Sequence, residues 1–214
     1  MAHRHYSLLD KICISVDQML RTLTHHAKTT GEHNPARNIP EVELSQNDKK
    51  HIARLMRVNH AGEVAAQALY HGQAVVTRSP QLKAKLHHAA LEEGNHLAWC
   101  KERLDELNSH TSYLNPLWYV GSFCIGMSAG IVGDKWSLGF ISETERQVIK
   151  HLDHHLTLMP AQDQKSKTIL EKMSQDEAQH RDDALHLGGA ELPSIIKVMM
   201  SLTSKVMVKT ALWV

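Results

Sequence analysis

Aromatic residues and glycine are scarce in this chain, and their scarcity restricts the fold. Only 5% of the 214 residues are aromatic, and glycine is thinly spread outside residues 121–139. Sandwiches and barrels are built from many short strands joined by turns, with apolar and polar residues alternating along each strand. No segment shows sustained alternation of that kind. The sequence therefore favours an all-α protein.

Cysteine is also rare. Cys13, Cys100 and Cys124 are dispersed, odd in number and form no CxxC pair. This pattern argues against both a disulfide framework and a zinc ribbon. We therefore expect a reducing, cytosol-facing compartment. Charged residues interrupt the first twenty positions, so we expect no signal peptide there.

Neither sign of charge dominates. Lys and Arg number 24, Asp and Glu number 23, and the net charge of +1 gives no reason to expect a nucleic-acid partner. With 42% hydrophobic residues the chain can bury a sizeable core. The unusual count is 17 histidines, most of which we expect at the surface. Those assigned to the surface are His25, His26, His87, His88, His154, His155 and His186.

Apolar spacing, together with helix start and stop signals, predicts six helical segments. Ser45 with Asp48 resembles a capping box, Pro80 suits a first turn, and Gly188-Gly189 suits a helix end. One segment is expected to break around residues 130–134 and to resume near Ser137. Short turns favour an antiparallel bundle. The predicted segments are 5–28, 45–77, 80–108, 115–158, 162–187 and 194–214, with a linker over 29–44.

Two ExxH motifs carry the chemistry. They are Glu93-Gly94-Asn95-His96 and Glu177-Ala178-Gln179-His180. Residues three apart share one face of a helix, so each Glu and His can reach the same ion. A single motif of this kind is weak, because Glu and His are common on solvated helix faces.

The spacing of two further glutamates strengthens the assignment. Glu63 precedes Glu93 by about thirty residues, and Glu145 precedes Glu177 by a similar interval. Thirty residues take the chain down one helix and back along the next to the same depth. Four helices would thus bring four Glu and two His to one level, which is the ligand set of di-iron and di-manganese bundles. Oxygen-rich ligation favours iron or manganese over zinc.

Residues beside these six receive other roles. Glu92 and Asp176 each precede an ExxH glutamate, and we expect them to accept a hydrogen bond from a ligand histidine of the facing helix. Glu143 would lie about 200° around the helix from Glu145, off the ligand face. His151 lies close to the face of Glu145 and could support a ligand or donate a proton. His60 and His71 flank Glu63 on other faces.

The runs RVNHAGEVAAQALYHGQ, EEGNHL, GDKWSLGF, TERQVIKHL and SQDEAQH resemble the demethoxyubiquinone hydroxylase family of ubiquinone biosynthesis. The resemblance covers about residues 50–214. It implies a ferritin-like four-helix bundle over 46–214, with additional terminal helices, and an N-terminal helix and linker over 1–45. The chain departs from the family's pattern at Leu152, where many relatives carry Tyr, and at Asn59, where others have Asp.

The resemblance also implies a monooxygenase that uses two iron ions and O2 to hydroxylate the ring of a demethoxyubiquinol. NADH or the quinol itself would be the reductant, and other ubiquinone-biosynthesis proteins would be partners. Glu93 and Glu177 would be shared between the two ions. The implied metal ligands are Glu63, Glu93, His96, Glu145, Glu177 and His180, with the four glutamates and His151 as the candidates for a catalytic role.

Two apolar segments agree with a lipid substrate. Residues 117–133 form an uncharged run slightly short for a spanning helix. Residues 194–213 combine apolar side chains with three lysines, which is typical of an interfacial helix on an anionic leaflet. We expect a peripheral protein at the cytoplasmic face of the cell membrane. A core or oligomer interface is the other interpretation of both segments, and the oligomeric state stays open.

Two other classes of function compete with the hydroxylase. An iron-handling or peroxide-reducing protein would use the same carboxylates, but this chain lacks rubredoxin-type cysteines. A quinone-binding scaffold would have no need of four glutamates at one depth. The sequence favours the hydroxylase.

Overall fold

The structure, a computed structural model, describes residues 7–213. Over that range every regular element is a helix, so the prediction of an all-α chain is confirmed. The helices are α1 (Leu8–Leu23), α2 (Gln46–Val76), α3 (Pro80–Glu106), α4 (Asn115–Val132), α5 (Asp134–Leu158), α6 (Gln164–His186) and α7 (Ser194–Ala211).

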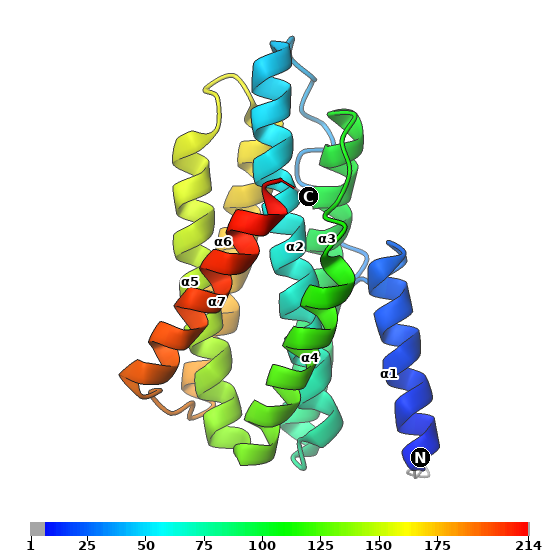
Figure 1. The fold of residues 1–214 in the computed structure, drawn as a ribbon, viewed down its shortest axis with the longest axis vertical. Helices are drawn as coiled ribbons and strands as arrows, with labels where there is room; N and C mark the ends of the chain where they lie inside the picture. The colour runs from blue at the N-terminus through cyan, green and yellow to red at the C-terminus, as the bar shows by residue number, and fades with distance from the viewer. Residues whose placement is uncertain (1–6, 214) are drawn as a thin grey trace.

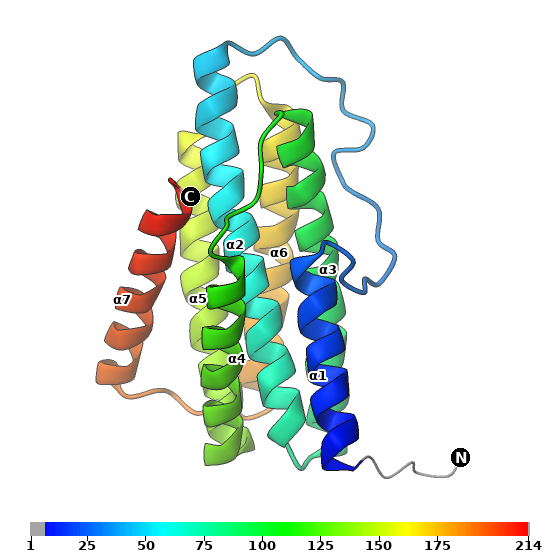
Figure 2. The same ribbon diagram turned by 45° about the vertical axis from the view of Figure 1, so that its right-hand side comes forward.

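Four long helices form the bundle that positions the site. α2 contacts α3 and α5, and α6 contacts the same two helices from the other side. Neighbouring helices in this set run antiparallel (Figure 1). α4 packs along α2 and connects the pair α2–α3 to the pair α5–α6. α1 and α7 lie on the outside of the bundle (Figure 2).

Most of the predicted helix ends are found in the structure. The side chain of Ser45 accepts a hydrogen bond from the backbone N–H of Asp48 at the start of α2. Pro80 occupies the first turn of α3, where its missing N–H costs nothing. Gly188 follows the end of α6 with φ 90°, a conformation that favours glycine.

Two predicted segments differ from the structure. The break expected within 115–158 is found at Gly133, which adopts φ 129° and turns the chain between α4 and α5, but α5 begins at Asp134 rather than near Ser137. The first helix is shorter than 5–28. It ends at Leu23, and His25 follows with φ 62°. Residues 5 and 6 of that prediction, and Val214 of the last one, lie outside the described residues.

α2 and α4 approach each other closely through glycine. A Cβ atom at Gly72 would lie 2.2 Å from the carbonyl oxygen of Phe123, and one at Gly126 would lie 2.3 Å from that of Leu69. Only glycine allows the two backbones to approach so closely. None of the helices within residues 7–213 has the length and apolarity that spanning a bilayer requires.

Candidate metal centre

The six residues predicted to bind metal come together inside the bundle. They form two groups whose potential ligand atoms lie within 4.8 Å of one another. One group contains Glu63 and His96, the other contains Glu145 and His180, and Glu93 and Glu177 belong to both. The arrangement therefore has two halves that share two carboxylates.

Each half draws on both pairs of helices. α2 and α5 contribute one glutamate each, Glu63 and Glu145. α3 and α6 contribute one ExxH motif each, and the i, i+3 spacing places Glu and His on the same face. The four carboxylates are at most 2% exposed.

The two histidines aim their Nδ1 atoms at the shared carboxylates. Nδ1 of His96 lies 3.1 Å from Oε1 of Glu177 and 3.3 Å from Oε2 of Glu93. Nδ1 of His180 lies 3.0 Å from Oε2 of Glu177 and 3.6 Å from Oε1 of Glu93. Glu63 is within reach too, with its Oε2 atom 3.5 Å from Nδ1 of His96.

The other nitrogen of each ring contacts a carboxylate on the facing helix. Nε2 of His96, on α3, lies 3.2 Å from Oδ2 of Asp176, on α6. Nε2 of His180, on α6, lies 3.0 Å from Oε2 of Glu92, on α3. These are the partners expected from the sequence. Such contacts fix the tautomer and the orientation of a ligand histidine.

The buried atoms of the centre are suited to a cation. Carboxylate oxygens of Glu63, Glu93, Glu145 and Glu177, together with Nδ1 of His96, are buried without a hydrogen-bond partner. Leaving so many acceptors and charges unpaired in an apolar interior is costly. Metal ions bound between them would satisfy these atoms, so the residues present fit a two-metal centre of oxygen and imidazole ligands.

The pKa values reflect the same crowding of negative charge. Burial, followed by the charges of Glu177 and Glu63, raises the pKa of Glu93 well above its usual range. Burial and the charge of Glu177 do the same for Glu145. Burial also acts to raise the pKa of Glu177, but the nearby rings of His180 and His96 outweigh it and lower the value to about 2. Bound cations would relieve the repulsion that these shifts express.

Tyr70 is a residue of the site that our sequence analysis missed. Its buried hydroxyl donates a 2.6 Å hydrogen bond to Oε1 of Glu145. Burial, then the charge of Glu145, raises the pKa of Tyr70 well above its ordinary value. Tyr70 lies two helical turns after Glu63, so its position on the ligand face of α2 could have been recognised.

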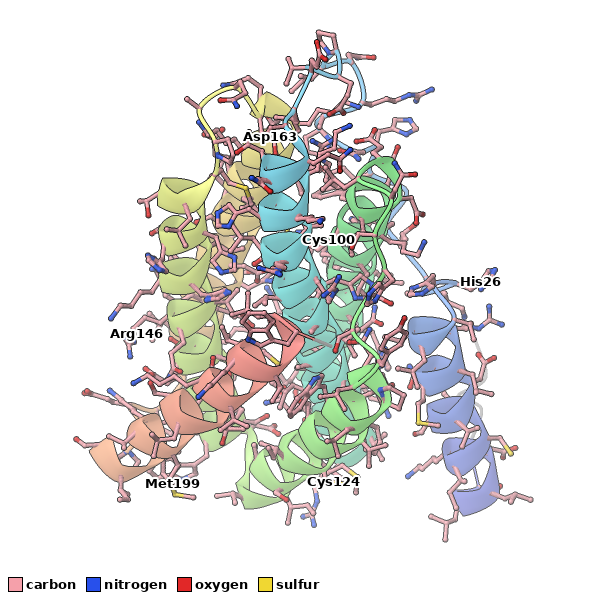
Figure 3. The ribbon with its side chains drawn as sticks, turned by 45° about the horizontal axis from the view of Figure 1, so that its top comes forward. His26, Cys100, Cys124, Arg146, Asp163 and Met199 are labelled. Atoms are coloured by element: carbon pink, nitrogen blue, oxygen red, sulfur yellow. The ribbon has the colours of Figure 1, made fainter. Side chains whose placement is uncertain are left out.

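Glu143 stays out of the centre, as its helical phase predicts. Its carboxylate accepts hydrogen bonds of 2.6 and 2.8 Å from the guanidinium of Arg146 and one of 2.7 Å from Gln147. Arg146 points outward from α5 (Figure 3). Glu145, two positions on, is the α5 glutamate that faces Glu93 and Glu177.

An apolar cavity of about 360 Å³ reaches the centre from one side. It lies between α2, α4, α5 and α7, and Glu63 and His151 are among its lining residues. Nε2 of His151 is buried there without a hydrogen-bond partner, and burial lowers the pKa of His151 to about 4. Figure 3 shows Met199 on α7 and Cys124 on α4, two of the helices that border the cavity.

His155 corrects one prediction. We assigned it to the surface, but it is 3% exposed, and its Nδ1 atom lies 2.8 Å from Oδ1 of Asn59. It lies one turn after His151, and their ring centroids are 3.9 Å apart. Asn59 therefore has a structural partner at a position where the family's pattern has Asp. Leu152, the other departure, is fully buried in the core.

Comparison of the sequence with known proteins shows the family to which the chain belongs. Residues 50–211 match the family described as ubiquinone biosynthesis protein COQ7. The chain belongs to this family. A protein of Acinetobacter baumannii named 3-demethoxyubiquinol 3-hydroxylase is 53% identical over 208 residues, covering 97% of this chain and 98% of the relative. One of the same name from Nitrosococcus oceani is 52% identical over 214 residues, covering all of both chains. The bundle is therefore ferritin-like, as the resemblance implied.

Proposed function

We propose that this chain is a 3-demethoxyubiquinol 3-hydroxylase, an O2-dependent monooxygenase of ubiquinone biosynthesis. Relatives of that name align with this chain over nearly their whole length. The observation that carries the proposal is the contact between a buried centre of four glutamates and two histidines and an apolar cavity at Glu63. A hydroxylase needs both an oxygen-activating centre and a dry site for its ring.

We infer that the centre holds two iron ions. Glu63 and His96 would bind one ion, Glu145 and His180 the other, and Glu93 and Glu177 both. When bound, iron supplies the chemistry to which oxygen and imidazole ligands are suited, the reduction of O2 and the transfer of one oxygen atom to an aromatic ring. The second oxygen atom leaves as water, with two electrons from NADH or from the quinol itself; the quinol would also supply both protons, whereas NADH would supply one and the solvent the other.

The cavity would bind the quinol ring and exclude water. Its walls are mostly apolar, with Leu69, Trp118, Ile125 and Met207 among them. In such surroundings Nε2 of His151 is a buried polar atom without a partner, and a ring hydroxyl is a suitable one. His151 would orient the ring and exchange a proton with its hydroxyl, and the short distance between His151 and His155 supports the ring position of His151.

A peripheral attachment to the membrane belongs to the same proposal. α7 exposes Ile195, Val198 and Leu202 beside its lysines, and α4 exposes Leu117 and Val120. An apolar surface next to the mouth of an apolar cavity suits a substrate dissolved in the bilayer. We expect the protein to bind the cytoplasmic leaflet through these two helices. Partner proteins, including others of ubiquinone biosynthesis, would dock elsewhere.

Turnover of a soluble substrate tests the activity. Apoprotein is reconstituted with ferrous iron without oxygen, then mixed with O2 and a short-tailed demethoxyquinol. The proposal expects a product heavier by one oxygen atom that retains label from ¹⁸O2. Consumption of peroxide or accumulation of ferric iron without hydroxylated product would favour the iron-handling alternative.

A further inference from the structure

A second hollow, away from the metal centre, is lined by positive charge. It has a volume of about 400 Å³ and lies where the N-terminal half of α2 meets the end of α3 and the end of α7. Its lining contains no acidic residue and four basic ones, Lys49, Lys50, Arg54 and Arg57. Figure 1 shows the C-terminal end of α7 beside this part of α2.

These four cations lack carboxylate partners within the described part of the chain. No aspartate or glutamate of residues 7–213 forms a salt bridge with any of them. Some cations elsewhere do have carboxylate partners. Arg103 contacts Asp163 at 3.0 Å, and Lys101 contacts Asp105 at 2.6 Å. The charges on α2 also stand at i, i+3 and i, i+4 spacing, where like charges repel.

Arg57 makes the lack of an anion costly. Its residue is 8% exposed, and its guanidinium donates only to neutral acceptors, the carbonyl oxygen of His110 at 2.9 Å and Oγ of Ser109 at 3.0 Å. Burial lowers its pKa, Tyr113 acts to raise it, and the smaller effect of the charge of Arg54 is again to lower it. A buried guanidinium that faces other cations is stabilised by a bound anion.

The hollow also has an ordered wall. The guanidinium of Arg54 lies 4.8 Å from the ring centroid of Trp213, at the distance of a cation–π contact. On the other side of this last turn of α7, Val208 and Trp118 border the apolar cavity. The basic hollow and the apolar cavity are therefore separated by the end of one helix.

We propose that this hollow binds a phosphate group through Lys50, Arg54 and Arg57. Guanidinium groups form paired, charge-assisted hydrogen bonds with phosphate oxygens, and no residue of the lining would repel them. The phosphate could belong to a phospholipid headgroup beside an interfacial α7 or to a soluble dinucleotide such as NADH. The proposal is independent of the hydroxylase function, because the binding needs neither iron nor turnover.

The test compares two double variants with equal change in net charge. Lys50→Gln/Arg54→Gln removes two exposed cations from the hollow. Arg37→Gln/Lys150→Gln removes two exposed cations outside it. Circular dichroism checks that both full-length variants fold like the parent. Binding of inorganic pyrophosphate and of NADH is measured by calorimetry, and flotation is measured with vesicles of equal parts phosphatidylglycerol and phosphatidylcholine.

We expect Lys50→Gln/Arg54→Gln to lose at least about tenfold in affinity for a phosphate-bearing probe. The control variant should stay within about twofold of the parent. Parallel losses for pyrophosphate and NADH would identify a soluble dinucleotide as the ligand. A selective loss of flotation, with NADH unaffected, would identify the lipid headgroup. If the two variants behave alike with all three probes, the hollow is no phosphate site and the proposal is overturned.

Discussion

Nε2 of His180 on α6 lies 3.0 Å from the carboxylate of Glu92 on α3, and Glu92 is the residue before Glu93, which faces the metal centre. The same relationship holds in reverse for His96 and Asp176, the residue before Glu177. Each ExxH helix thus supplies both a Glu–His pair of the candidate metal centre and the carboxylate that contacts the histidine of its partner helix.

This reciprocity predicts unequal roles for adjacent glutamates. Glu92→Ala should lower iron affinity by about 10–100-fold, because the ring of His180 loses the partner that fixes its tautomer. Glu93→Ala should abolish binding of both ions, since its carboxylate belongs to both groups. Iron titration of the two apoproteins measures the difference. Equal losses in the two variants would refute the distinction between an orienting and a shared carboxylate.

Helical phase on α5 gives a second matched pair. Glu145→Ala should abolish iron binding at one site and all hydroxylation, because Glu145 faces Glu93 and Glu177. Glu143→Ala should keep both, at a stability cost of no more than about 1 kcal/mol, because its partner Arg146 is largely exposed. The iron content of each variant and the mass of its reaction product measure the two effects. A Glu143→Ala variant as inactive as Glu145→Ala would show that the centre is built differently.

The buried His155 predicts a pH dependence of stability. Burial lowers its pKa from 6.5 to about 3, so between these values the unfolded chain binds a proton that the folded protein does not. Its contribution to stability is complete above pH 6.5 and is lost as the pH falls toward 3, by about 1.4 kcal/mol per pH unit.

His154 provides the control, because it is exposed at the preceding position of the same helix. Urea unfolding is measured at several pH values below neutrality. His155→Gln should lessen the loss of unfolding free energy on acidification, while the contribution of His151 remains, and His154→Gln should leave the slope of the parent. An unchanged slope in His155→Gln would mean that His155 is protonated in the folded state.

Alanine substitutions at two glycines of α2 distinguish the effect of close helix packing on stability from that of helix propensity. Gly72→Ala should destabilise the protein by about 1–3 kcal/mol, because its Cβ would meet the backbone of α4. Gly62→Ala meets no atom within 4 Å and should stabilise the fold by up to about 1 kcal/mol. Thermal unfolding of both variants checks the contrast. Similar shifts of the melting temperature would show that α2 and α4 can separate freely.

The sequence predicted much of this architecture because its constraints are periodic. The thirty-residue interval from Glu63 to Glu93, and its repeat from Glu145 to Glu177, follows from helix length, so the depth of each residue could be predicted. The i, i+3 motif then determined which face the residues share. The orienting roles of Glu92 and Asp176 followed from their positions beside that face. The division of the chain at residue 45 stays a prediction.

What the sequence did not predict depends on contacts between distant elements. His155 carries no local mark of burial, since its partner Asn59 lies on another helix. The break within residues 130–134 was predicted, but several glycines there left its exact position open, and α5 begins at Asp134 rather than near Ser137. The basic hollow joins three elements that are far apart in the sequence.

The central claim is that two metal ions share Glu93 and Glu177, and the number of irons bound per chain tests it most directly. Apoprotein is titrated with ferrous iron without oxygen, and bound iron is counted after removal of excess metal. The geometry predicts two ions per chain in the parent, one in Glu145→Ala and none in Glu93→Ala. A parent protein that saturates with a single ion, or that binds zinc in preference after iron loading, would contradict the two-metal centre.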